Sequence, residues 1–397
     1  MKRGWTKQDL LDDRDLLIKM CEDNDNLESR LHANKVLNCI NHYLESKYSP
    51  IASSKPTIKT LIENATLSYY FYGRYHSLIS EFYFNTKHFH GPMIAISDRL
   101  EKILGNQDNF DTLVQCKVSD NEAINLAASF YNSFDSELAA VVSNIFKSDK
   151  LSINFVEHEK GLNKDIEADG YCIFIDLLKK YYMSVDKSEN VSKISNIIHE
   201  TGHILDYYYN PSKTYSEETY LLSEVPSLFP EIVSLFDNIG NRNDITTNHE
   251  LYSHLTTYYE HSNALVFHEI IINKWKECGY KTNIKFYFSL RRDYGLNYSD
   301  IYRFLSHEIV NSGSYVLSFE ACCELVYIYY VEGNKEKALD IYKRIIKADK
   351  NEDELVVVLK ELELGKHLKC IVRKILIRFI KSIKEFERDE KMEHKLY

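Results

Sequence analysis

Two histidines and a glutamate stand at a spacing that suits metal-assisted hydrolysis. The stretch 197–205 contains His-Glu-x-x-His, with His199 and His203 four residues apart. Side chains four residues apart lie on one face of a helix, so both imidazole rings can reach one metal ion. Glu200 lies about 100° round the helix, where its carboxylate can take a proton from water at the metal. We therefore expect a zinc site with a general base beside it.

The residues around this motif predict the helix that it needs. Apolar side chains fall on one stripe at helical spacing, namely Val191, Ile194, Ile197, Ile198, Ile204 and Leu205. His199, His203 and Asp206 lie on roughly the opposite side, so the histidines do not enter the most apolar contact of the helix. The pattern also arises by chance, and the alternative is a pair of ordinary surface or core histidines.

A zinc site needs at least a third protein ligand. The next helical stretch supplies the carboxylates Glu217, Glu218, Glu224 and Glu231. Glu224 opens the string E-V-P-S-L-F-P-E, and Glu231 closes it. Gly202 inside the histidine motif, followed by this string, resembles the M3 family of zinc metallopeptidases, which includes thimet oligopeptidase and oligoendopeptidase F. In that family H-E-x-G-H is followed by a glutamate that opens E-x-x-S/T-x-x-x-E.

The resemblance assigns roles to the residues that match the family motif. It implies one zinc ion per chain, with the ligands His199, His203 and Glu224. It implies that Glu200 is the general base, and that Glu231 orients a ligand histidine; the alternative for Glu231 is an ordinary surface acid. Pro226 suits the first turn of a helix, whereas Pro230 predicts a kink just before Glu231. Asp206 stands where bacterial members often carry a third histidine. We expect it to accept a hydrogen bond at the site, and it is the weaker candidate for third ligand.

The family binds the oxyanion with a histidine and a tyrosine-rich segment that follows it. His307 and Tyr315 match in kind and approximate spacing, so the resemblance implies this role for them. Leu317 and Phe319 stand near positions where oligoendopeptidase-like members carry further tyrosines. A phenol can donate a hydrogen bond to a developing alkoxide and a phenyl ring cannot. The oxyanion site is therefore either reduced or shifted in register, and the alternative for His307 is a buried structural role.

The segment before the metal helix predicts a helix and two strands. An amphipathic helix is expected from Asp120 to Val142, with Ser119 or Asp120 as its N-cap. The short β-rich stretches 153–156 and 168–175 predict strands. The resemblance implies a small sheet that borders a substrate cleft, with Gly170 and Tyr171 in contact with an extended peptide. A plain structural hairpin is the alternative.

Composition predicts a mainly α-helical fold, because the 397 residues include only 13 Gly and 6 Pro and show long periodic runs. The resemblance implies that this helical fold is M3-like. The net charge of −10 speaks against nucleic acid as a partner. We find no signal peptide and no apolar run that could span a bilayer. The 8 cysteines are scattered without a Cys-x-x-Cys pair, which indicates free thiols in a reducing compartment, so we expect a cytoplasmic protein.

The chain divides into three predicted parts: an N-terminal helical region 1–118, a catalytic domain 119–365 and a basic amphipathic helix 366–397. Relative to typical family members the shortening is mainly N-terminal. The C-terminal helix can lie on an anionic membrane or dock on an acidic protein such as this one, and we favour docking. Four further histidines are expected to be surface or packing residues: His249, His254, His261 and His268.

These expectations define a zinc-dependent endopeptidase that hydrolyses short peptides. Two alternatives belong to other classes. One is a catalytically impaired M3-like module that binds zinc together with a peptide or protein, which the altered segment after His307 favours and the intact Glu200 disfavours. The other is a helical scaffold without metal.

Overall fold

The structure is a computed structural model, and it describes part of the chain: residues 57–63, 65, 93, 95–96, 118–156, 170–175, 179–186, 191–211, 222–238, 245–306, 309–348 and 352–393. Most of the predicted N-terminal region 1–118 lies outside these residues, and so does His307. The described elements fall into two compact units, of which the first contains the sheet and most of the metal-motif helix, and the second contains the helices after it.

The first unit is built on a mixed sheet. Its strands are β1 (Leu151–Val156), β2 (Gly170–Ile175) and β3 (Lys180–Asp186), in the order β1-β3-β2. β1 pairs with β3 in parallel and β2 pairs with β3 antiparallel. The sequence predicted β1 and β2 but missed β3, the central strand. Residues 181–185 of β3 are all buried, so both of its faces are covered and the alternation of apolar and polar residues is absent.

The predicted helix 120–142 is wrong in its continuity. The structure has two helices, α6 (Asp120–Phe134) and α7 (Ser136–Lys147). Asp135 between them has an extended backbone, with φ −157° and ψ 129°. Its carboxylate accepts hydrogen bonds from the backbone N–H groups of Glu137 and Leu138, at 2.9 and 3.0 Å. Asp135 therefore ends one helix and caps the next, because its side chain competes for the backbone donors of the following turn.

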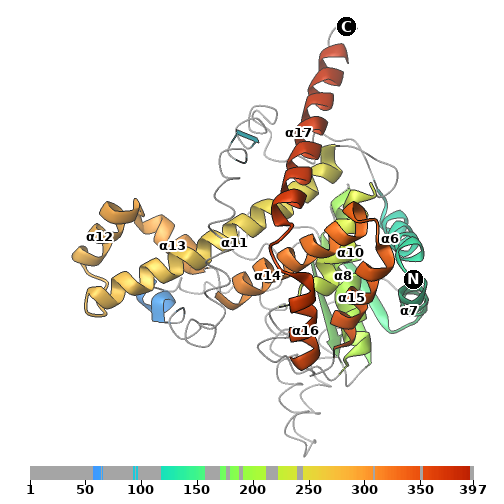
Figure 1. Ribbon diagram of the computed structural model, residues 1–397, viewed down its shortest axis with the longest axis horizontal. Helices are drawn as coiled ribbons and strands as arrows, with labels where there is room; N and C mark the ends of the chain where they lie inside the picture. Colours follow the sequence, from blue (N-terminus) through green and yellow to red (C-terminus); the bar gives the residue numbers. More distant parts are fainter. Residues whose placement is uncertain are drawn as a thin grey trace, which may run out of the picture. The chain divides into compact units, whose positions relative to one another are not determined.

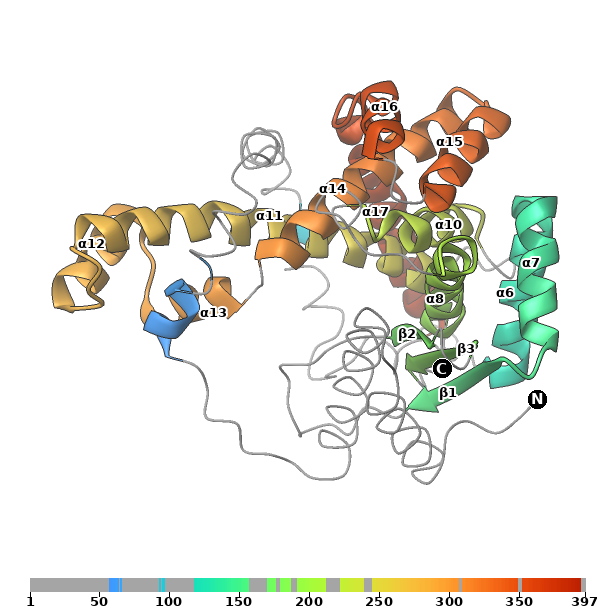
Figure 2. The same cartoon turned by 90° about the horizontal axis from the view of Figure 1, so that it is seen from below.

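The metal-motif helix α8 (Val191–Tyr209) is fixed by contacts from α6 and the sheet, and Figure 2 shows it beside the strands. The buried hydroxyl of Tyr131 donates to the carbonyl of Ile198 at 3.0 Å. Lys193 lies 2.8 Å from the carboxylate of Asp120. The ring of Phe174 on β2 lies 5.9 Å from that of Tyr207, between centroids. These contacts hold α8 at both of its ends and in its middle.

The second unit is helical and its members pack around one long helix (Figure 1). The central helix α11 runs over 33 residues, Ile245–Glu277. The others are α10 (Val225–Phe236), α12 (Ile284–Tyr294), α13 (Tyr298–Ser306), α14 (Ile309–Val326), the π-helical turn η5 (Tyr327–Val331), α15 (Lys335–Lys347), α16 (Glu352–Leu362) and α17 (Leu368–Glu393). α10, α14 and α17 all pack on α11, so α11 positions the side chains that they carry.

Helix α10 runs through Pro230 and continues to Phe236. A proline inside a helix has no N–H for the carbonyl four residues earlier, which here is that of Pro226. The hydroxyl of Tyr342 on α15 donates to that carbonyl at 2.7 Å. The hydrogen bond lost to Pro230 is thus replaced by a side chain, and α10 reaches the turn that contains Glu231.

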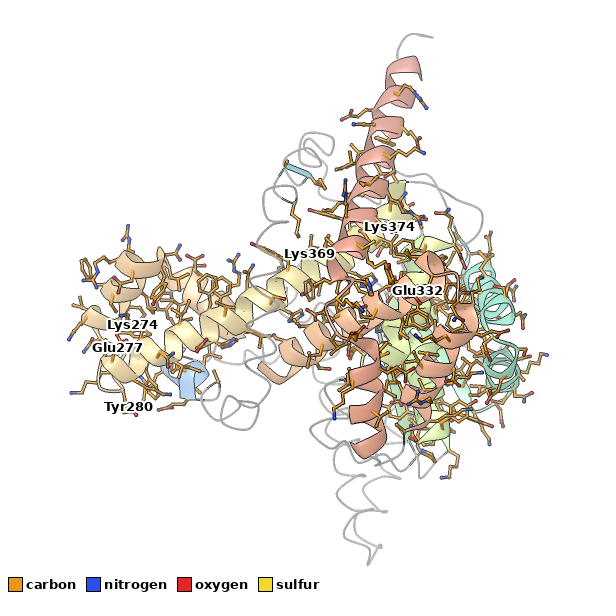
Figure 3. All side chains as sticks on the ribbon, in the orientation of Figure 1. Lys274, Glu277, Tyr280, Glu332, Lys369 and Lys374 are labelled. Carbon is orange, nitrogen blue, oxygen red and sulfur yellow. The ribbon has the colours of Figure 1, made fainter. Side chains whose placement is uncertain are left out.

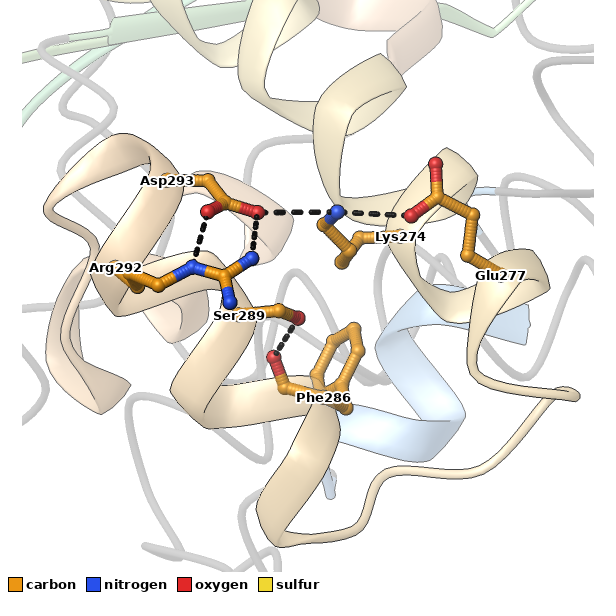
Figure 4. A network of polar contacts seen from close by, with 6 residues as sticks. All are labelled: Lys274, Glu277, Phe286, Ser289, Arg292 and Asp293. Carbon is orange, nitrogen blue, oxygen red and sulfur yellow. Dashed lines mark hydrogen bonds and ion pairs between the residues drawn. The ribbon is translucent and has the colours of Figure 1, made fainter.

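The end of α11 is joined to α12 by a polar network (Figure 4). Lys274 lies 2.8 Å from the carboxylate of Glu277 and 3.2 Å from that of Asp293 on α12. Arg292 pairs with the same Asp293 at 2.6 Å. Glu277 and Arg292 are largely exposed, so their pairs contribute little to stability on their own, whereas the side chain of Lys274 is 14% exposed. Together they fix the direction in which α12 leaves α11.

The C-terminal helix docks on its own chain, in agreement with the favoured prediction. α17 packs on α11 and α14 through a buried stripe that includes Ile371, Ile375 and Phe379. Lys369 and Lys374 lie exposed on α17 (Figure 3). In the part of the chain that the structure describes, no helix combines the length and the apolar character needed to cross a membrane.

Helix α14 carries two carboxyl groups that are buried. Glu320 accepts a hydrogen bond from the hydroxyl of Tyr258 at 2.6 Å. Burial raises the pKa of Glu320 well above its usual range, and the hydrogen bond from Tyr258 opposes that rise. Glu324 contacts both the backbone N–H and the ring Nδ1 of His367, each at 2.7 Å. Both acids are therefore held by partners from other helices.

We predict that Glu320→Gln stabilises the protein as the pH rises. The folded-state pKa of Glu320 lies above its unfolded value, so the stability linked to its proton is present below the unfolded pKa and is lost as the pH rises toward the folded one. Glutamine stays neutral and still accepts from Tyr258. The gain in unfolding free energy should grow from pH 5 to pH 9, reaching on the order of 1–3 kcal/mol. Urea titrations across that range would measure it, and a pH-independent difference would contradict the prediction.

Candidate active site

The first unit carries the His-Glu-x-x-His motif on α8. The rings of His199 and His203 lie 5.1 Å apart between centroids, at an interplanar angle of 73°, and both side chains are half-buried. Ile197 and Ile198 on the other side of the helix are fully buried. The apolar stripe therefore anchors α8 in the core and leaves the two imidazoles on a partly open face, as the sequence predicted for this helix.

Glu200 is buried against the first residue of β2. Only 4% of Glu200 is exposed. A Cβ atom added to Gly170 would lie 2.8 Å from Glu200 Oε1 and 2.9 Å from the carbonyl oxygen of Ser184. Only glycine permits so close an approach of β2 to the carboxylate. Gly170 was predicted to contact substrate, and the structure gives it this second reason to be glycine.

Tyr171 and Cys172 follow Gly170 on β2. Burial raises the pKa of the Cys172 thiol well above its usual range, and the negative charge of Glu200 adds to the rise. Cys172 therefore stays a neutral thiol beside Glu200. The backbone of Tyr171 pairs with Ser184 across β2 and β3, whereas its side chain lies outside the described residues.

The second unit carries Glu224 at the N-cap of α10. Its own side chain does not cap the helix. The hydroxyl of Ser227 contacts Glu224 Oε2 at 3.3 Å and donates to the Glu224 carbonyl at 2.9 Å. The serine of the E-V-P-S string thus orients the glutamate that opens it.

Glu231 lies seven residues after Glu224, on α10, and is buried, with 3% of its surface exposed. It was predicted to orient a ligand histidine, but the partner observed within its own unit is His254 on α11, with Oε1 and Nε2 3.2 Å apart. The other ring nitrogen of His254, Nδ1, lies 3.2 Å from the hydroxyl of Tyr315 on α14. Burial raises the pKa of Tyr315 well above its usual range, and the negative Glu231 and Glu224 add to the rise. The phenol therefore keeps its proton.

Three predicted ligands form a candidate metal group. The ligand atoms of His199, His203 and Glu224 lie within 4.8 Å of one another, and each residue is half-buried. Asp206, the alternative third ligand, is not part of this group. It is buried, and its Oδ1 accepts a hydrogen bond from the side chain of Asn210 at 3.3 Å. Two imidazoles and a carboxylate are a donor set that suits zinc with an open position.

Sequence reasoning missed His254, which was expected to be a surface or packing residue. Its partner Tyr315 lies 61 positions away along the chain. His261, two turns further along α11, contacts the hydroxyl of Ser312 at 2.9 Å, and its ring lies 5.1 Å from that of Tyr315. The seven-residue spacing of these histidines placed them on one face of the helix. A signal was therefore present, but the sequence did not show that α14 covers that face.

Two solved structures of peptidases are similar to this structure. A structure of PZ peptidase A with an inhibitor has a TM-score of 0.52 and 16% identity, and the match covers 92% of this chain and 71% of that one. A protein from Bacillus anthracis described as an oligoendopeptidase F has a TM-score of 0.50 and 13% identity, and the match covers 94% of this chain and 69% of that one. No family model matches the sequence, and neither does any curated protein.

These similarities show the fold. The chain has a peptidase fold, mainly α-helical with a small sheet. More narrowly, that fold is M3-like, as the resemblance of the sequence implied.

We predict that Gly170→Ala lowers stability by about 1–3 kcal/mol, because the added methyl group overpacks the contact with Glu200 and the Ser184 carbonyl. The double variant Gly170→Ala/Glu200→Ala is the matched control. It should recover part of the loss, since it removes the nearest atom and leaves only the Ser184 contact. Melting temperatures of the four proteins in this cycle would measure the coupling. Strictly additive losses would show that Gly170 does not make room for Glu200.

Proposed function

We propose that this protein is a zinc-dependent peptidase that hydrolyses short peptides. The observation that carries the proposal is the group formed by His199, His203 and Glu224, with Glu200 on the same helix as the two histidines. The M3-like peptidase fold supports it, because the proposed ligands stand at the family motif. The predicted division into 1–118, 119–365 and 366–397 is part of the same proposal.

The donor set fits one zinc ion held by His199, His203 and Glu224. Zinc, when bound, supplies Lewis acidity toward a peptide carbonyl and toward water. Asp206 would act through hydrogen bonds rather than as a ligand. Ser227 would hold the Glu224 carboxylate in the orientation seen here, which reduces the reorganisation needed on binding.

Glu200 is the proposed general base. Its carboxylate would take a proton from the attacking water while the water oxygen bonds to the carbonyl carbon. It would then pass that proton to the amide nitrogen as the carbon–nitrogen bond breaks, so the products are a carboxylate and an amine. Burial against Gly170 keeps bulk water from competing for that proton. Tyr315, with its proton retained, would donate to the oxyanion, and His307 is the proposed second donor.

The edge of the sheet supports the proposed substrate class. Among the described strands β2 pairs only with β3, so it lies at an edge of the described sheet. An extended peptide can add to such an edge by main-chain hydrogen bonds, with little preference for sequence. Gly170 and Tyr171 begin this strand, and Gly170 lies beside Glu200. Binding there would bring a peptide backbone next to the proposed base.

A second candidate function is a catalytically impaired module that binds zinc and a peptide. One observation favours it. Leu317 and Phe319, near which related enzymes carry tyrosines, are both buried, and Phe319 stacks on Tyr258 at 4.8 Å between ring centroids. Neither residue can donate to an oxyanion, so Tyr315 would act with fewer partners than in the family.

The proposed ligands predict the metal content of two variants. His199→Ala and Glu224→Ala should each reduce bound zinc from about one per chain to well below half, because a structural or catalytic site requires at least three protein ligands. Elemental analysis after dialysis against zinc-buffered solution would measure this. His367→Asn and Glu260→Ala, which change the same residue types away from the group, should keep their zinc. Full occupancy in Glu224→Ala would exclude it as the third ligand.

The general-base role predicts a variant that keeps zinc but loses activity. Glu200→Gln preserves the size of the side chain, but its amide cannot accept the proton, so hydrolysis should fall by roughly 10²–10⁴. A quenched-fluorescent peptide library, assayed with and without chelator, would give the rate, and elemental analysis would give the zinc content. Parent-level activity in Glu200→Gln would contradict the role. A zinc-loaded parent that cleaves no peptide in the library would favour the impaired module.

A further inference from the structure

We propose that His254 is a positioning residue that turns the phenol proton of Tyr315 toward the substrate. The inference deepens the proposed function and rests on it. It starts from a chain of three side chains on three helices of one unit: Glu231 on α10, His254 on α11 and Tyr315 on α14. Nε2 of His254 lies 3.2 Å from Glu231 Oε1, and Nδ1 lies 3.2 Å from the Tyr315 hydroxyl.

The protonation of this chain follows from the charge that His254 faces. Glu231 Oε1 lies 3.2 Å from His254 Nε2 as an ion-pair contact, and a carboxylate at that distance favours a proton on the nitrogen over a lone pair. A neutral imidazole then has no proton on Nδ1, and Tyr315 must donate its single proton to His254. In that arrangement the phenol has nothing left to donate to an oxyanion.

The imidazolium form reverses the last bond. With protons on both nitrogens, His254 donates through Nδ1 to the Tyr315 oxygen. The phenol proton is then released to another acceptor. A hydrogen bond received by the phenol oxygen also makes its O–H a better donor, because such chains polarise one another. Only this arrangement lets Tyr315 stabilise the oxyanion.

The surroundings favour the imidazolium. Glu231 is 4% exposed at its side chain and His254 is 16% exposed, so water screens this pair only weakly. A buried carboxylate without a compensating charge is costly, and His254 is the cationic partner that lies within reach in the same unit. Burial and the negative Glu231 and Glu224 also raise the pKa of Tyr315, which keeps its proton on the phenol. The carboxylate thus selects the charged imidazole, and the charged imidazole frees the phenol proton.

His261 holds the ring of Tyr315 but not its hydroxyl. Its ring lies 5.1 Å from that of Tyr315 between centroids, and its Nδ1 contacts Ser312. On the other side Phe319 stacks parallel at 6.5 Å. The ring plane is therefore set by packing, whereas the hydroxyl of Tyr315 meets two side chains of α11, His254 and Thr257. Loss of His254 should change the proton and not the position of the ring.

A double-mutant cycle tests the inference. His254→Ala should lower kcat by roughly 10- to 100-fold with little change in KM, and Tyr315→Phe by roughly 10²–10³, since one oxyanion donor is lost. The double variant should be no slower than Tyr315→Phe alone, because both changes remove one effect. Glu231→Gln should resemble His254→Ala and add little to it. His249→Gln changes a half-buried histidine on the same helix. It is the matched control and should keep the parent kcat.

Other readouts separate this idea from a structural role and from failure of the proposed function. Zinc content should stay near the parent value in His254→Ala, whereas the melting temperature should fall, because Glu231 loses its cationic partner. The ring-carbon NMR signal of Tyr315, identified by its absence in Tyr315→Phe, should shift in His254→Ala without substrate. If the zinc-loaded parent cleaves nothing, the proposed function fails, yet that shift still tests the coupling. Multiplicative losses in the cycle, or an unmoved Tyr315 signal, would overturn the inference.

Discussion

The cost of keeping carboxyl groups out of water constrains the whole second unit. α10 and α14 bury Glu231, Glu320 and Glu324, and an isolated buried carboxylate costs several kcal/mol. Each of the three acids offsets that cost through a different partner. Glu231 faces a histidine, Glu320 takes a hydroxyl donor and keeps its proton, and Glu324 receives both donors of His367. Since every partner comes from another helix, satisfying these acids fixes how α10, α11, α14 and α17 pack.

This constraint separates structural acids from the one that is available for a metal. Glu224 stands at a helix N-terminus with a serine hydroxyl on its carboxylate and is half-buried. Glu320 faces the hydroxyl of Tyr258 and Glu324 faces His367, whereas the ligand atoms of Glu224 lie together with those of His199 and His203. The contacts of the two acids on α14 assign them to packing, and Glu224 is the acid that we propose as a metal ligand.

Features that depend on residues close together in the sequence could be predicted, whereas contacts between residues far apart in the sequence could not. The His-Glu-x-x-His motif is local: two histidines four residues apart and an apolar stripe together specify a helix and its partly open face. Pro230 was predicted to kink α10, but the donor that replaces its lost hydrogen bond, Tyr342, is 116 positions from Pro226. His254 was missed for the same reason. β3 was missed because burial on both faces removes the alternation of apolar and polar residues. The break at Asp135 was missed because an acidic residue inside an amphipathic run does not by itself indicate a helix cap.

Each of the two units determines where a proton resides, and each does so by a different arrangement of side chains. In the first unit, β2 approaches Glu200 so closely that only a glycine fits, and the neighbouring thiol of Cys172 stays neutral. The Glu200 carboxylate therefore lies beside a thiol that keeps its own proton. In the second unit, Glu231 favours the charged form of His254, and the charged His254 frees the phenol proton of Tyr315. One arrangement prepares a proton acceptor and the other prepares a proton donor. Hydrolysis of an amide needs both, because the nitrogen must gain a proton while the oxyanion is stabilised.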